Sequence, residues 1–194
     1  MKYFSSLVKN IKWDVLKFTN KLSPKVDNVP WVVNRNVNLL YRPFIEDILS
    51  LVYELHHKGC NLYIFEGYRS FERQSYLYEQ GRTRLYDYLG RKLPKVTNAK
   101  PGFSYHNYGM AVDLVFDANI YKPGMQWTWD GNYSILGETL RKYPSLEWAG
   151  DWNKFKEFPH VQLVTDYDIY ELKEFNESNV EDVWNVLDEE NGFS

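Results

Sequence analysis

Apolar residues recur at helical spacing in several stretches of the chain. One stripe lies in residues 1–22 and ends before Ser23-Pro24, and a stronger stripe over about 43–57 ends at Gly59. Ser70 has the position of an N-cap for a helix that runs to about residue 80. The same spacing predicts helices over about 134–143, 167–175 and 180–187.

Three shorter segments have the pattern of β-strands. Residues 60–65 are apolar apart from Asn61, which predicts a buried strand. Residues 110–117 alternate, so we predict a half-buried strand that presents Asp113 on the face opposite Leu114. A strand over 160–164 places His160 and Gln162 on one face. Residues 82–103 are predicted to form a long loop, and a Trp/Gly-rich turn is predicted before the last strand.

These short, interleaved elements predict an α+β fold with a small, mostly antiparallel sheet and flanking helices. The chain has 194 residues, of which 44% are hydrophobic and 18% aromatic, and this suits one globular domain with a sizeable core. We divide it into an N-terminal amphipathic helix over 1–22, a main domain over 30–164, and an acidic C-terminal helical tail over 165–194 that packs on the same domain. The N-terminal stripe could lie on an anionic membrane surface, but stripes of this kind more often dock on their own domain, so we predict intramolecular packing.

The charge is distributed unevenly along the chain. The net charge is −3, yet residues 165–194 carry ten acidic residues against Lys173 alone. The remaining residues are therefore basic overall and could approach an anionic polymer such as a cell wall, although a solvated surface explains the same charge. The lysines form no dense patch, which disfavours nucleic-acid binding.

The sequence contains no apolar run of membrane-spanning length, and residues 1–7 lack the uninterrupted apolar core of a signal peptide. We therefore expect a monomer that is cytoplasmic as synthesised, without stable membrane insertion.

Two histidines and one aspartate are the candidates for metal chemistry. Cys60 is the only cysteine, which excludes an internal disulfide and a thiolate metal cluster. Because His56-His57 falls in a predicted helix, His106 and His160 remain, and together with Asp113 they make the three-ligand set of a catalytic zinc site. A lone histidine is more often a buried polar group that is hydrogen-bonded within the protein. The prediction of a metal site therefore depends on all three residues together.

Glu157 lies three residues before His160 and could be the base of such a site. Taken alone it reads as a solvated acid beside Lys154 and Lys156.

The motifs around these residues resemble those of a known family. Ser-x-His-x-x-Gly-x-Ala-x-Asp is complete over 104–113, and Glu-x-x-His is complete over 157–160. The chain resembles the zinc peptidases that cut peptidoglycan stem peptides, a group of D-Ala-D-Ala carboxypeptidases, D-Ala-D-Ala dipeptidases and phage endolysin L-alanyl-D-glutamate endopeptidases. Segments 66–70, 73–74, 81–83, 96–102 and 148–152 look like the endolysin branch, and the resemblance covers about residues 40–188. Ala149 departs from it, since the branch commonly has glycine there.

The resemblance implies a hedgehog or D-Ala-D-Ala peptidase-like fold with a zinc groove on the sheet, and it makes residues 30–164 the catalytic domain. One Zn²⁺ would be held by His106, Asp113 and His160, and would lower the pKa of its water toward ~7. Glu157 would be the general base, and Arg69 would stabilise the developing oxyanion. Surface pairing of Arg69 with Glu66 or Glu72 is the alternative. Substrate binding or support of the metal ligands is expected for the following residues: Ser104, Tyr105, Asp151 and Trp152.

The function implied is hydrolysis of a peptide bond in bacterial peptidoglycan, with L-Ala-D-Glu as the first expectation and cell-wall lysis after release if the protein is of the phage type. A D-Ala-D-Ala carboxypeptidase or dipeptidase is the alternative with the same zinc centre. A non-catalytic zinc-bound module that binds the cell wall is a third, and the presence of Glu157 argues against it.

Overall fold

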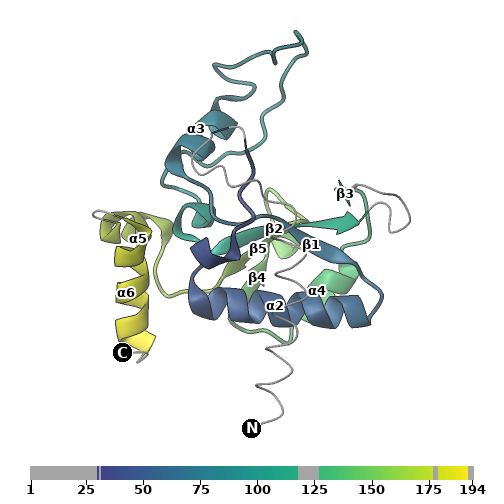
Figure 1. The fold of residues 1–194 in the computed structure, drawn as a ribbon, viewed down its shortest axis with the longest axis vertical. Helices are drawn as coiled ribbons and strands as arrows, with labels where there is room; N and C mark the ends of the chain where they lie inside the picture. Colours follow the sequence, from purple (N-terminus) through teal and green to yellow (C-terminus); the bar gives the residue numbers. More distant parts are fainter. Residues whose placement is uncertain (1–29, 31, 118–126, 177–178, 192–194) are drawn as a thin grey trace.

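The structure is a computed structural model that describes residues 30, 32–117, 127–176 and 179–191 (Figure 1). The helix predicted over residues 1–22 lies outside the described residues. No helix in these ranges is long and apolar enough to cross a membrane.

The centre of the fold is an antiparallel sheet with strand order β1-β2-β5-β4 (Figure 1). Its strands are β1 (Leu62–Glu66), β2 (Ala111–Asp117), β4 (Leu146–Trp148) and β5 (His160–Leu163), and β3 (Trp127–Thr128) pairs with β2. Every pairing is antiparallel, so the α+β prediction is confirmed. Strands β3 and β4 were not predicted, because strands of two and three residues are too short to show alternation. Part of the predicted Trp/Gly-rich turn is therefore strand β4.

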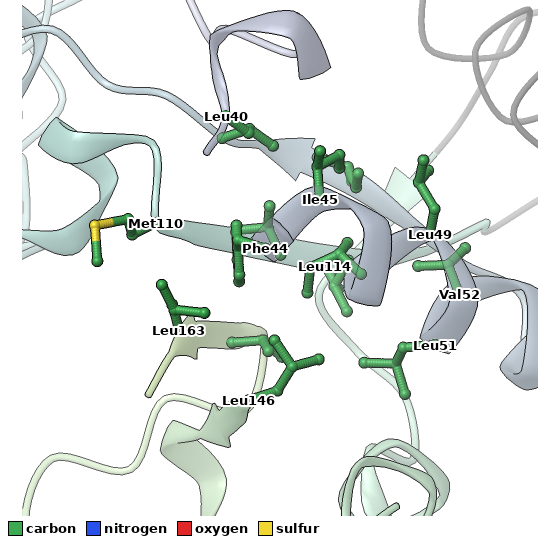
Figure 2. Close-up of a cluster of buried hydrophobic side chains, with 14 of the residues drawn as sticks. Leu40, Phe44, Ile45, Leu49, Leu51, Val52, Met110, Leu114, Leu146 and Leu163 are labelled. Atoms are coloured by element: carbon green, nitrogen blue, oxygen red, sulfur yellow. The ribbon is translucent and has the colours of Figure 1, made fainter. Parts of the chain in front are cut away.

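Helix α2 (Arg42–His57) covers one face of the sheet and supplies much of the core. Figure 2 shows Phe44 and Leu51 of this helix among Leu114 of β2, Leu146 of β4 and Leu163 of β5. Full burial of one such side chain contributes about 1.5–3 kcal/mol. Helix α4 (Ser134–Leu140) contacts both α2 and β4. Because Leu114 points into this core, its neighbour Asp113 points to the opposite face of β2.

Strand β2 is more buried than the alternation predicted. Ala111 and Val115 belong to the second face but are buried like Val112 and Leu114. The 3-10 helix η2 (Tyr105–Tyr108) contacts β2. The prediction of a half-buried strand had left the second face of β2 open to solvent. Asp113 is therefore held on a largely enclosed strand.

Helix α3 (Phe71–Glu79) begins at its predicted N-cap, because the Ser70 side chain accepts a hydrogen bond from the backbone N–H of Arg73. After the helix, Gly81 has φ +66°, and a Cβ there would lie 2.6 Å from the backbone nitrogen of Lys95. Glycine at this position therefore allows the two ends of residues 81–96 to approach each other closely.

The tail forms two helices, α5 (Ile169–Phe175) and α6 (Val180–Asn191), of which α6 extends beyond the predicted end. Asp168 caps α5 in a capping box with Glu171. Leu172, Val183 and Leu187 join the hydrophobic core. Helix α6 contacts η2, and the indole Nε1 of Trp184 donates to the carbonyl of Tyr108 at 2.8 Å.

Candidate metal centre and groove

Three adjacent strands place polar side chains in one row across the sheet. Asp113 on β2 pairs in register with His160 on β5 and with Glu66 on β1. His106 comes from η2, which ends at Gly109 in the left-handed region with φ 67°. A Cβ at Gly109 would lie 2.6 Å from the carbonyl oxygen of Leu39, so this turn requires glycine. The turn brings His106 back beside Asp113.

The three candidate ligand atoms form a nearly equilateral triangle. His106 Nε2 lies 3.4 Å from Asp113 Oδ1 and 3.3 Å from His160 Nδ1, and the distance from His160 Nδ1 to Asp113 Oδ1 is 3.3 Å. Bonds of about 2.1 Å to a tetrahedral ion separate its ligand atoms by about 3.4 Å. These residues could therefore hold a metal ion with little rearrangement.

The outer nitrogen of each imidazole has an acceptor that fixes its tautomer. His106 Nδ1 lies 2.7 Å from the carbonyl oxygen of Gly67, so this nitrogen carries the hydrogen. His160 Nε2 lies 3.1 Å from Gln162 Oε1. Since Gln162 Nε2 donates to Glu147 at 2.9 Å, its amide oxygen must face His160. Both imidazoles therefore direct a lone pair into the cluster, as metal ligation needs.

The relay behind His160 extends to Trp152, whose Nε1 donates to Glu147 Oε1 at 2.9 Å. Gln162 could have been found from sequence, because it shares a face with His160 two residues away. Glu147 gave no signal, since it lies on the unpredicted strand β4.

Arg69 is buried next to the cluster and is not a surface residue. Its Nη2 donates to Asp113 Oδ2 at 3.0 Å and to Glu66 Oε2 at 2.6 Å, its Nε donates to Glu66 Oε2, and its Nη1 donates to Gln74 Oε1. These bonds use four of the five guanidinium N–H groups. Arg73 Nε donates to the other oxygen of Glu66 at 2.8 Å. The conspicuous segments 66–70 and 73–74 thus build one ionic network around Asp113.

Burial and the neighbouring charges shift the pKa values of the three cluster residues in different directions. Burial alone would raise the pKa of Asp113, but His106, His160 and Arg69 hold it well below its ordinary range. Burial and the charge of Arg69 lower the pKa of His106, whereas the carboxylate of Asp113 overcomes burial and raises the pKa of His160. Asp113 therefore stays ionised beside the two imidazoles.

Glu157 stands at the rim of a groove of about 740 Å³ whose floor is the cluster. Its side chain is open to solvent, yet the surrounding protein raises its pKa above 4.5, because lost hydration and the charge of Asp113 outweigh the attraction of His160 and Arg69. The backbone N–H of His160 bonds to the Glu157 carbonyl at 3.1 Å, which ties the two residues in a turn.

The remaining predicted residues lie in different places around the groove. Ser104, Tyr105 and Trp152 line the groove, and Tyr105 and Trp152 also line a second pocket of about 500 Å³. Asp151 is exposed and lines that second pocket. The outer nitrogens of the imidazoles face Gly67 and Gln162, so Gln162 has the place expected for Asp151.

Two relatives are similar over parts of the chain. The peptidoglycan L-alanyl-D-glutamate endopeptidase CwlK of Bacillus subtilis (strain 168) is 37% identical over 113 residues, which are 56% of this chain and 64% of CwlK. This chain therefore matches less than two thirds of the length of that relative. A crystal structure of the Serratia marcescens L-Ala D-Glu endopeptidase ChiX shares 24% identity, covering 66% of this chain and 84% of that chain with a TM-score of 0.42.

A family model covers the strands and loops that carry most of the cluster. The VanY model, described as D-alanyl-D-alanine carboxypeptidase, matches residues 38–143, which include Arg69, His106 and Asp113. Glu157 and His160 follow the matched range, and the pairing of β5 with β2 brings His160 to Asp113. With more than half of its length matched, the chain belongs to the VanY family of peptidases.

Proposed function

We propose that the protein is a zinc peptidase that hydrolyses a peptide bond in peptidoglycan stem peptides, with the bond between L-Ala and D-Glu as its target. The observation that carries this proposal is the triangle of His106, Asp113 and His160 at the floor of a groove that has Glu157 at its rim.

The donor set favours zinc over the harder cations. Two imidazole nitrogens and one carboxylate oxygen suit Zn²⁺, whereas Mg²⁺ and Ca²⁺ prefer all-oxygen sites. When bound, zinc supplies a Lewis acid that polarises the scissile carbonyl. It also lowers the pKa of water, so that water can lose a proton and act as the nucleophile.

The side chains around the triangle have separate tasks. Glu157 accepts the proton of the attacking water and returns it to the leaving amine, and its raised pKa suits both steps. Arg69 orients Asp113 through Nη2, and at most one guanidinium N–H remains for an oxygen of the substrate. The Gly67 carbonyl and Gln162 accept hydrogen bonds from the outer nitrogens of the imidazoles. The inner nitrogens are thereby left without a hydrogen and are able to bind the metal.

The name of the relative CwlK supports the L-Ala-D-Glu bond as the target. Lys154 and Lys156 line the groove and can pair with the carboxylates that stem peptides carry. The description of the VanY family supports the second candidate, a D-Ala-D-Ala carboxypeptidase. Both reactions use the same centre and differ in the products.

Digestion of purified peptidoglycan followed by mass analysis of the fragments separates these functions. Fragments with a newly exposed amino-terminal D-Glu are expected, and chelation should abolish their release until zinc is added back. Release of D-Ala alone would establish the carboxypeptidase instead. An unchanged digest with zinc-loaded protein would overturn the proposed function.

A further inference from the structure

Residues 81–96, here named the arm, project away from the body of the fold beyond α3 (Figure 1). The arm is an ordered hairpin: the backbone N–H of Leu93 bonds to the carbonyl of Leu85, and Asp87 and Arg91 are joined through backbone and side chains. A bridge between Tyr86 and Lys92 continues this pairing. Its shape is therefore held by local hydrogen bonds, without a core of its own.

The tip of the arm exposes large apolar side chains to solvent. Tyr88 is 92% exposed, Tyr86 and Leu89 are each 61% exposed, and Leu85 is 48% exposed. Their burial therefore contributes little to folding. Several large apolar side chains exposed within five consecutive residues are typical of a binding surface.

The arm is also basic. It contains five cationic residues and one acidic residue, namely Arg82, Arg84, Arg91, Lys92, Lys95 and Asp87. The whole chain has a net charge of −3, so the positive charge of the arm is a local feature. Tyrosine faces among cations suit a partner that offers both apolar ring surfaces and negative charge.

The base of the arm forms part of the groove wall. Val96 and the nearby Thr97 and Ala99 line the groove, as do His106, Asp113 and His160. Gln74, which bonds to Arg69, also donates to the carbonyl of Ala99 at 2.7 Å. A molecule that lies in the groove can therefore continue along the arm.

A second segment of the groove wall has the same combination of an exposed aromatic ring and cations. Phe155 is 72% exposed between Lys154 and Lys156, and all three line the groove. Phe155 has φ 56°, a left-handed conformation that is unfavourable for a residue other than glycine. The chain thus accepts backbone strain at a position where an aromatic ring is presented to the groove.

Given the proposed function, we infer that the arm binds the glycan strand of peptidoglycan, with its anionic stem peptides, while one stem peptide occupies the groove. Sugar rings provide the apolar faces for the tyrosines, and the carboxylates of neighbouring stem peptides provide the negative charge. A single soluble stem peptide lacks this strand and gains nothing from the arm.

The test compares two double variants of the full chain that change the net charge equally. The arm variant is Tyr88→Ser with Lys92→Glu. The control is Tyr53→Ser with Arg42→Glu, both on α2, which covers the opposite face of the sheet. Binding is measured by co-sedimentation with purified sacculi in the presence of a chelator, so that no bond is cut. The sacculi are first stripped of phosphate-containing polymers with hydrofluoric acid. Hydrolysis of a soluble stem peptide is measured separately with zinc.

The arm variant should bind sacculi at least about tenfold more weakly than the control, which corresponds to about 1.4 kcal/mol. Both variants should hydrolyse the soluble peptide like the unmodified chain, and binding should weaken as salt is added. Equal binding by the two variants would overturn the inference. Loss of binding after removal of the phosphate-containing polymers would also overturn it. The same holds if the arm is needed for binding to anionic vesicles but not to sacculi, or if it is needed for self-association. Failure of the unmodified chain to cut any soluble peptide would count against the proposed function, not against binding by the arm.

Discussion

Arg69 Nη2 donates to Asp113 Oδ2 at 3.0 Å, while the other oxygen of the same carboxylate faces both imidazoles. The guanidinium thereby sets the direction of the oxygen that would bind a metal. Lysine cannot reproduce this contact together with the two bonds to Glu66, because its ammonium lacks the planar fork.

Arg69→Lys should therefore weaken zinc binding by about 10- to 100-fold, measured by competition with a chromogenic chelator. Arg73→Lys is the matched control, because Arg73 bonds to Glu66 but, in the described part of the chain, forms no hydrogen bond or ion pair with Asp113. If Arg69 acted only on the oxyanion, zinc affinity would be unchanged and only turnover would fall.

Glu157→Gln should keep zinc bound and lower turnover by about 100-fold or more, because the amide cannot accept a proton. Metal content by atomic absorption and hydrolysis of a soluble stem peptide measure the two effects. Loss of the metal in this variant would make Glu157 a ligand.

The pKa of Glu157 should lie above 4.5 in the metal-free protein, because loss of hydration at the groove disfavours its carboxylate. Below this pKa the group is protonated and cannot act as a base, so the rate should decline toward acid pH. Carbon-13 NMR titration of the glutamate carboxyls measures the value, and Glu157→Gln identifies the resonance by its absence. Saturating zinc should lower the pKa, since a nearby cation favours the carboxylate. A pKa at or below 4.5 without metal would contradict the prediction.

Gln162→Leu should weaken zinc binding by about 10- to 100-fold, since it removes the acceptor that fixes the tautomer of His160. The absorption spectrum of the cobalt-substituted protein should change as well, because the imidazole is no longer held in place. Val164→Leu, at an exposed position just after β5, is the control and should leave both unchanged. An unaltered cobalt spectrum in Gln162→Leu would show that the relay does not orient His160.

The juxtaposition of His106 and Asp113 could be predicted from the sequence, because both lie in one motif whose geometry is local, whereas His160 joins them through the pairing of β5 with β2. The left-handed Gly109 brings His106 to Asp113, and alternation along β2 turns Asp113 away from the core. The support of the cluster could not be predicted in the same way. It depends on which strands become neighbours, and strand β4, which carries Glu147, is only three residues long. The burial of Arg69 likewise follows from the position of β1 beside β2, which no spacing along the chain reveals.

The hydrogen bond from Trp184 to Tyr108 joins the last described helix to the short helix that carries His106. A ring carbon of the same indole would lie 3.0 Å from a Cβ at Gly109, so the indole packs closely against this turn. A fragment that ends before α6 would retain all the ligands in its sequence, yet it would lack the support that holds the first of them against the sheet. Cleavage between α5 and α6 is therefore expected to loosen His106 without removing a residue that lines the groove.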